Sequence, residues 1–166
     1  MAPTKQKGDL AELKVACHLA SLGYNLAFPY GEDCDFDLIL VTDDRLERVQ
    51  VKHCRSDGLV MEVRCNSHSL TNGKVRRTKR YTARTIDWIA AYDATTDRCF
   101  YIPARLLGDG RSRYSLRFAP PRNNQRALIH DAADYERPEP PTTSGVTEDG
   151  ASGIRTHDLP DANRTL

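Results

Sequence analysis

Two apolar runs joined by a short polar turn constrain the fold of this chain more than any other stretch. They span residues 35–41 and 45–52 and predict a β-hairpin with a tight turn. Side chains two residues apart share a face of a strand, so Gln50 and Lys52 lie on one face of the second strand. Antiparallel pairing can bring Asp37 of the first strand beside this amide and this ammonium. An acid, an amide oxygen and a cation held on rigid strands suit the cleavage of a phosphodiester.

These residues resemble the core motif of the PD-(D/E)XK nucleases, in which an Asp on one strand precedes an acid-x-Lys on the next. Asp37 matches the first Asp, and residues 50–52 match the acid-x-Lys. Gln50 stands where most members have Glu or Asp, which is similar to a branch that includes the group I intron homing endonucleases. Asp35 shares the face of Asp37, but the apolar run follows Asp37 directly, as in the family, so Asp35 is interpreted as a strand-entry acid. The resemblance covers about residues 7–103, the size of one small domain.

The resemblance implies a site for a divalent cation, Mg²⁺ or Mn²⁺. Asp37 and Glu12 would hold the ion directly or through water, with the carbonyl of Val51 also facing it. Lys52 would orient or help deprotonate the attacking water and stabilise charge on the phosphorane. Gln50 would supply a neutral oxygen, which lowers the negative charge of the site and should weaken its metal affinity.

A helical pattern at residues 8–22 precedes the hairpin, and Gly23 fits a left-handed helix stop. The apolar residues expected to face the core are Leu10, Leu13, Cys17, Ala20, Leu19 and Leu22. Glu12 lies on the same side of the helix as Val15 and Leu19. An acid that borders a buried face needs a partner. Glu12 can pair with a lysine or lie at the edge of the stripe, or it can bind a metal ion. Residues 7–12 look like the opening of the nuclease family, which favours the metal ion.

Residues 74–84 form a basic run without an acid. Its six cations are Lys74, Arg76, Arg77, Lys79, Arg80 and Arg84. One interpretation is a solvated loop or helix face. A run of one sign just after the proposed active-site strands also suits contacts with DNA phosphates, which supply sequence-independent affinity. Tyr81, inside the run, can stack on or bind the nucleic acid, or pack in the core.

The rest of the pattern completes an α/β fold. The further strands predicted are 24–28, 59–65, 86–92, 98–103 and 113–118, of which 86–92 and 98–103 form a second hairpin. A loop is predicted at 66–73, a helical turn at 104–107 and a last helix at 123–135. The expected fold class is therefore α/β, and the resemblance makes it restriction-endonuclease-like, with an N-terminal helix packed on a mixed β-sheet of about five or six strands.

Composition divides the chain in two. Hydrophobic residues make up 39% of the 166 residues and suffice for one folded domain, expected at 1–134 with a net charge of +4 that suits a polyanion. Residues 135–166 are rich in Pro, Ser, Thr, Gly and acids and are expected to form a disordered acidic tail. The Gly-Ile-Arg-Thr stretch at 153–156 can be encoded by the complement of a tRNA-gene T-arm. An overlap with such a gene and a coincidence are the alternatives, and the nucleotide sequence decides between them.

Cysteine spacing and hydropathy indicate the redox state of the thiols and the cellular location of the protein. The five cysteines form no C-x-x-C pair, and together with His53 and His68 they match no zinc spacing, so free thiols are expected. No signal peptide and no long apolar span is visible, which favours a cytoplasmic protein that does not contact a membrane.

Three functions fit these observations. The first is a Mg²⁺- or Mn²⁺-dependent endonuclease acting on double-stranded DNA, as in a homing endonuclease of a mobile element. The second is a Holliday junction resolvase, which shares the order of helix Glu, Asp and E-x-K. The third is a DNA-binding protein with a decayed nuclease site. Cutting both strands needs two active sites and the chain offers one, so a homodimer or homotetramer is expected.

Overall fold

The computed structural model describes residues 3–31, 34–71, 74–120 and 129–138. Within these ranges it contains one α-helix, α1 (Thr4–Ser21), and two 3₁₀ helices, η1 (Ala104–Leu107) and η2 (Ala132–Tyr135). The strands are β1 (Asn25–Ala27), β2 (Leu38–Val41), β3 (Leu46–Cys54), β4 (Val60–Arg64), β5 (Asn66–Thr71), β6 (Lys74–Arg80), β7 (Trp88–Asp93), β8 (Arg98–Pro103) and β9 (Arg113–Arg117). None of the helices described is long and apolar enough to cross a membrane.

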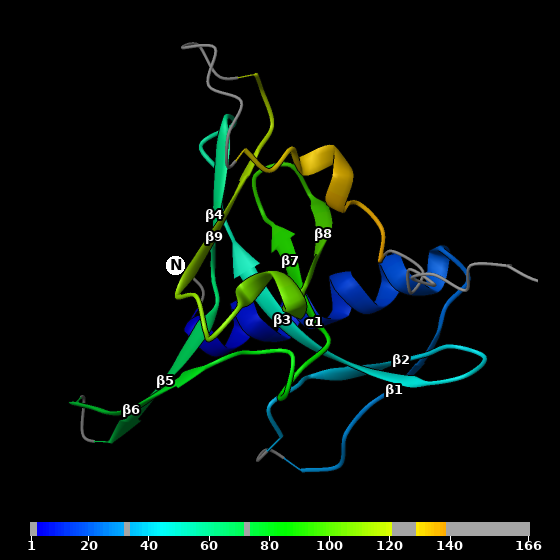
Figure 1. Cartoon of the computed structure of the whole chain (residues 1–166), viewed down its shortest axis with the longest axis vertical. Coiled ribbons are helices and arrows are strands. Elements are labelled where there is room, and N and C mark those ends of the chain that lie inside the picture. The colour runs from blue at the N-terminus through cyan, green and yellow to red at the C-terminus, as the bar shows by residue number, and fades with distance from the viewer. Residues whose placement is uncertain (1–2, 32–33, 72–73, 121–128, 139–166) are drawn as a thin grey trace, which may run out of the picture.

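Five strands form a central mixed sheet in the order β1-β2-β3-β7-β8. Both predicted hairpins are present, since β2 pairs with β3 and β7 pairs with β8, each antiparallel. Between the hairpins, β3 and β7 run parallel, with Val49 opposite Trp88 and Cys54 opposite Asp93. The sheet is therefore mixed, as the sequence predicts, and β3 is its middle strand (Figure 1).

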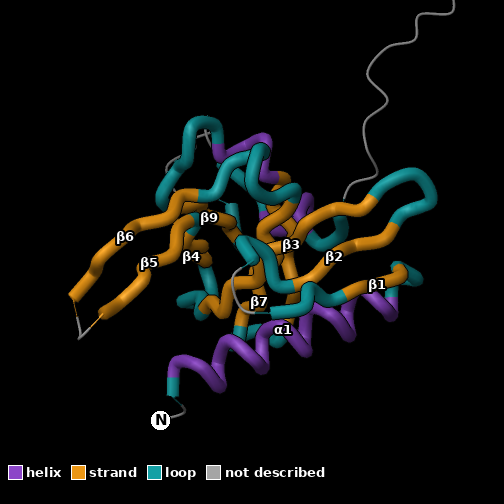
Figure 2. Tube along the Cα trace, turned by 90° about the horizontal axis from the view of Figure 1, so that it is seen from below, coloured by secondary structure: helices purple, strands orange, loops and turns teal. Residues whose placement is uncertain are grey.

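Helix α1 lies along one face of the sheet (Figure 2), and the stripe that it buries agrees only in part with the predicted one. Its buried residues are Ala11, Val15 and Leu19. Of the predicted stripe, Leu19 is buried, but the prediction is wrong for Leu10 and Leu13, which are 45% and 70% exposed. The small side chain of Ala11 lets the helix approach the sheet closely, so close packing rather than side-chain size selects the buried face. Gly23, with φ of +88°, follows the end of the helix as predicted.

The central sheet separates two hydrophobic cores. Alternate residues of β3, such as Val49 and Val51, pack with α1 and with Tyr101 of β8. Cys54 belongs instead to the core on the opposite face. That second core also contains residues of β4 and β9, which pair antiparallel in a separate two-stranded sheet. The strand predicted at 113–118 is therefore present, as part of this second layer.

A third pair of strands, β5 and β6, forms an antiparallel hairpin that projects from the body of the protein in both views (Figures 1 and 2). The loop predicted at 66–73 is therefore wrong, because most of it is β5. The basic run is mostly strand β6 rather than a loop or helix. The pairing shifts between Ser69 and Leu70, as at a β-bulge. These strands could not be predicted from the polar sequence, because a projecting hairpin does not need the alternation of apolar and polar residues that marks a half-buried strand.

The end of the described chain differs from the expected helix at 123–135. Of that stretch, the structure describes 129–135, which contains η2, whereas 121–128 lie outside the described residues. Residues 135–138 still contact the domain, since the Tyr135 hydroxyl lies 2.8 Å from that of Tyr114 and the Pro138 carbonyl accepts a 3.3 Å hydrogen bond from Tyr24. Residues 139–166 are not described, so the domain division at residue 134 and the tRNA-gene overlap remain predictions.

Candidate active site

The candidate site begins where β3 continues past the first residue of β2. Leu38 pairs with Val49, so the edge of β3 on that side is free of β2 from Gln50 onward. The backbone N–H of Asp37 still donates to the carbonyl of Val49 at 2.9 Å. The backbone N–H of Val51 donates to Oδ2 of Asp37 at 2.6 Å instead of to a strand. The end of β2 thus fixes the Asp37 carboxylate against the edge of β3.

Gln50 contacts the same oxygen and is only 8% exposed. Its Nε2 donates to Oδ2 of Asp37 and, at 3.2 Å, to the carbonyl of Val51. An ionised carboxylate and a carbonyl only accept hydrogen bonds, so the amide nitrogen rather than the amide oxygen must face them. Gln50 therefore orients Asp37, which differs from the expectation that it offers an oxygen to a metal ion.

We expect Gln50→Glu to destabilise the metal-free protein, because the new carboxylate would face Asp37 and the carbonyl of Val51, both of which are acceptors. The free energy of unfolding should fall by on the order of 3 kcal/mol, as when a buried charge lacks a partner. A divalent cation that binds these oxygens should restore much of the loss. Thermal melts with and without Mg²⁺ measure both effects, and Gln6→Glu on the exposed start of α1 is the control. If Gln50→Glu had the melting temperature of wild type without Mg²⁺, this would contradict the orientation in which Nε2 of Gln50 faces Asp37.

Glu12 of α1 lines the same cavity as Asp37. The cavity holds about 380 Å³ and is bounded by Asp9, Glu12, Phe28, Pro29, Gly31, Cys34, Phe36 and Asp37. Burial and the negative charges of Asp37 and Asp9 raise the pKa of Glu12. Burial also raises the pKa of Asp37, against the opposing effects of the Val51 N–H, Lys52 and Gln50. The negative charges of Glu12 and Asp37 therefore repel each other in one cavity. A bound cation would reduce this repulsion.

The donors at this cavity fit a hard divalent cation. Both hydrogen bonds to the Asp37 carboxylate reach Oδ2, and Oδ1 accepts none from the residues that the structure describes. Oxygen ligands of this kind bind Mg²⁺, with water completing the coordination. In the described ranges, no group of three or more His, Cys, Asp or Glu side chains is placed to hold a metal ion. The ion would therefore rely on two carboxylates, the Val51 carbonyl and water.

Lys52 follows Gln50 on the same face of β3 and brings a cation to the site. Its Nζ lies 4.8 Å from the ring centroid of Tyr81 and 3.4 Å from the Tyr81 hydroxyl. The charge of Lys52 lowers the pKa of Asp37, but among the described residues no ion pair joins the two side chains. Tyr81 is 3% exposed and belongs to the core on that face of the sheet, so it packs as well as contacting Lys52.

The basic hairpin reaches the candidate site through Lys79. Lys79 pairs with Asp35, two residues before Asp37, so Asp35 connects β6 to the entry of β2. The next residue, Arg80, packs against Gly110 so closely that a Cβ at position 110 would lie 2.9 Å from the Arg80 Cβ. Arg84 lies in the turn after Tyr81 and is exposed. The remaining cations of the run are placed only by the backbone pairing of β6: Lys74, Arg76 and Arg77.

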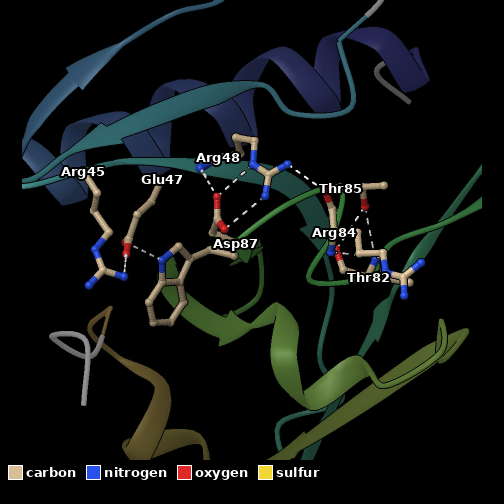
Figure 3. Close-up of polar contacts among 8 residues, drawn as sticks. Arg45, Glu47, Arg48, Thr82, Arg84, Thr85 and Asp87 are labelled. Carbon is tan, nitrogen blue, oxygen red and sulfur yellow. Dashed lines mark hydrogen bonds and ion pairs between the residues drawn. The ribbon is translucent and has the colours of Figure 1, made fainter. Parts of the chain in front are cut away.

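Arg48 is a further cation on the strand face of Gln50 and Lys52, and the sequence analysis did not single it out. It shares a strand face with Gln50 and Lys52, so the period of two was the signal that could have found it. Its Nε donates to Oδ2 of Asp87 at 2.9 Å, and its Nη2 donates to Oδ1 at 3.2 Å. Its Nη1 donates to the carbonyl of Arg84 at 2.9 Å (Figure 3). Arg48 thus joins β3 to the turn that follows Tyr81.

A second cavity of about 430 Å³ lies beside the C-terminal half of α1. Two ion pairs line it, Lys14 with Asp97 at 2.8 Å and Arg98 with Glu136. It contains none of the residues predicted for catalysis, metal binding or DNA binding. The smaller cavity at Asp37 is therefore the candidate active site.

Comparison with known proteins identifies the family. The model of the PD-(D/E)XK endonuclease family matches residues 2–138. A solved structure of a bacterial homing endonuclease, I-Ssp6803I, resembles the fold with a TM-score of 0.62 and 19% sequence identity, covering 81% of this chain and 88% of that chain. A search of curated proteins finds no match. The fold is restriction-endonuclease-like, as predicted, and the chain belongs to the PD-(D/E)XK endonuclease family.

Proposed function

We propose that this protein is a divalent-metal-dependent endonuclease that hydrolyses phosphodiester bonds of double-stranded DNA. The observation that carries the proposal is the Asp37 carboxylate, held by Val51 and Gln50 at the cavity that Glu12 also lines. Family membership supports the class of reaction, and this arrangement supports Asp37 and Glu12 as its site. Mg²⁺ or Mn²⁺ is the ion that such oxygen donors favour.

The side chains have different proposed roles in hydrolysis. The metal ion, when bound, acts as a Lewis acid on the scissile phosphate and lowers the pKa of a bound water. Asp37, Glu12 and the Val51 carbonyl would hold the ion, and Gln50 donates to Oδ2 of Asp37, which leaves Oδ1 available. Lys52 orients the attacking water or helps remove its proton, and its charge stabilises the phosphorane.

The β5–β6 hairpin is the proposed DNA-binding surface. It projects from the body and places the basic strand β6 next to the entry of β2, through Lys79 and Asp35. A two-stranded ribbon is narrow enough to enter the major groove of B-DNA. Arg84, exposed in the turn after Tyr81, adds a further cation. Contacts of these cations with phosphates would fix the duplex relative to the site.

Neutralising Arg76, Arg77, Lys79 and Arg80 together, each to Gln, should weaken DNA binding and its salt dependence. Removing three or four phosphate contacts should reduce the slope of log affinity against log salt concentration by roughly 3. Fluorescence anisotropy with labelled duplex over a salt series measures this slope. The control removes Lys14 and Arg98, which line the second cavity. An unchanged slope in the hairpin variant would mean that the run is only a solvated face.

A double-strand cut requires two such sites, so we propose a homodimer or homotetramer with two-fold symmetry. A monomeric mass by light scattering, both free and on DNA, would contradict this. Within this function, we propose the more specific role of a homing endonuclease of a mobile element, which the similarity of the fold to I-Ssp6803I supports. Cutting of a long DNA at one or a few positions agrees with that role, whereas frequent cutting opposes it.

One assay separates this function from its alternatives. Linear duplex and four-way junction DNA are incubated with the protein, with and without Mg²⁺. Mg²⁺-dependent cleavage of the linear duplex is the expected result. Cleavage restricted to junctions would favour a Holliday junction resolvase. Binding without cleavage of either substrate would favour a DNA-binding protein with a decayed site.

A further inference from the structure

Lys52 and Asp37 carry opposite charges at one site, yet their side chains are held apart. Lys52 lies on β3, whose residues 49–54 pair with β7, and Asp37 is fixed to the free edge of the same strand. A flexible lysine beside a half-buried carboxylate would ordinarily form an ion pair with it, because burial strengthens their attraction. Among the residues described, the ammonium of Lys52 instead contacts the ring and hydroxyl of Tyr81.

Three kinds of contact hold Tyr81 in place. Its ring is 3% exposed within the core on the Lys52 side of the sheet. Its backbone N–H donates to the carbonyl of Cys65 at 3.3 Å. The turn that follows it is closed by Thr82 and Thr85 and is joined to β3 through the bond from Arg48 to the Arg84 carbonyl (Figure 3). The ring therefore offers a fixed position for the ammonium, with the Lys52 Nζ 4.8 Å from its centroid.

A neutral aromatic face suits this purpose better than an acid would. It attracts an ammonium by its quadrupole and adds no negative charge to a site that already holds two carboxylates. The contact also leaves the lysine able to turn toward a phosphate, because no ion pair has to be broken. If Lys52 paired with Asp37 instead, its ammonium would occupy the oxygen that a metal ion needs.

From these contacts we infer that Tyr81 is a positioning residue, whose ring holds Lys52 off the Asp37 carboxylate and so keeps Oδ1 of Asp37 free for a divalent cation. The inference rests on the proposed function for the role of the cation. It assigns Tyr81 a part in the site that the basic run around it did not indicate. It also connects the root of the DNA-binding hairpin to the lysine of the active site, since Tyr81 directly follows β6.

The test compares Tyr81→Leu, which removes the ring, with Tyr81→Phe, which keeps it. Lysines carrying ¹³C at the ε position report the contact by NMR, and Lys52→Arg assigns the Lys52 signal. In wild type and Tyr81→Phe, the ε-protons of Lys52 should be shifted upfield by the ring, and in Tyr81→Leu they should not. Tyr114→Leu is the matched control, because Tyr114 is an equally buried tyrosine of the same core, 1% exposed, that does not contact Lys52.

The consequence for the metal site is measured with Mn²⁺ by electron paramagnetic resonance. Tyr81→Leu should weaken Mn²⁺ binding by about tenfold, within the range of pairwise couplings found in double-mutant cycles, and Tyr81→Phe should retain most of the affinity. In a Lys52→Ala background, Tyr81→Leu should have no further effect. Cleavage should show a lower kcat for Tyr81→Leu, with KM for DNA nearly unchanged.

The outcomes separate this inference from the proposed function. Equal loss of Mn²⁺ affinity in both backgrounds would mean that Tyr81 acts only through packing and would overturn the inference. Wild-type protein that binds Mn²⁺ without the upfield Lys52 signal would also overturn it, while leaving the nuclease proposal in place. Wild-type protein that shows the signal but neither binds Mn²⁺ nor cuts DNA would contradict the proposed function and, with it, the role of Tyr81 in metal binding.

Discussion

Replacing Asp37 with Asn should reduce the rate of DNA cleavage by roughly a thousandfold while leaving the protein folded. That factor corresponds to about 4 kcal/mol of transition-state stabilisation, a typical contribution of a well-held catalytic metal ion. Asn keeps a carbonyl oxygen that can accept from the N–H groups of Val51 and Gln50, so the contacts at the end of β2 can survive. Burial disfavours the charge of Asp37, so removing that charge offsets the weaker hydrogen bonds.

Single-turnover cleavage with Mg²⁺ measures the rate, and anisotropy without a metal ion measures DNA affinity. The affinity should be unchanged or tighter, because one negative charge near the phosphates is lost. Asp35→Asn is the matched control, since Asp35 lies two residues away and pairs with Lys79. Full activity of Asp37→Asn together with an inactive Asp35→Asn would move the metal-binding role to Asp35.

The hairpin of β2 and β3, which directly follows Asp37, could be predicted from sequence because its signals are local. The apolar runs within 35–41 and 45–52 and the polar turn between them predict the strands, the turn and the pairing together, and β2 and β3 pair as expected. Pairing then determines which residues of β3 lie beyond the end of β2. The sequence alone therefore predicts that Asp37 and Gln50 lie close together.

The helix shows where local pattern fails. Large apolar residues such as Leu10 and Leu13 mark one stripe of α1, but the sheet meets the stripe of Ala11 and Val15. Which stripe is buried depends on how closely two surfaces fit, and that is decided by the partner as well as by the helix. Glu12 lies on the side of Val15 and Leu19, both of which are buried, so its position at the cavity was predictable even though the exposure of Leu10 and Leu13 was not.

Two details of the site depend on contacts between distant segments. Gln50 could turn its oxygen or its nitrogen toward the site, and only the acceptors around it, Asp37 and the Val51 carbonyl, decide for nitrogen. Tyr81 is 29 residues from Lys52 in sequence, and no periodicity connects them. Their contact requires β5 and β6, a pair of polar strands that the sequence pattern did not indicate.

Lys52→Ala should lower the cleavage rate by about a thousandfold, within the range that a positioned proton-transfer group contributes. The reason is that Lys52 acts on charge that develops in the transition state, so its loss affects the chemical step rather than binding. DNA affinity should change by less than about threefold, because it is the sum of many phosphate contacts. Mn²⁺ affinity should be retained, since the ammonium lies on Tyr81 and is not paired with Asp37.

The matched control is Lys14→Ala, which removes the same charge from the second cavity, where Lys14 pairs with Asp97. Single-turnover rates and anisotropy on the same duplex give both quantities for the two variants. Lys52→Arg adds a second comparison, because it keeps the charge but not the compact, rotatable ammonium. Activity in Lys52→Arg would show that charge alone suffices, and inactivity would point to orientation of the water. Cleavage by Lys52→Ala at the wild-type rate would remove Lys52 from the reaction and place the catalytic cation elsewhere, with Arg48 on the same face of β3 as the next candidate.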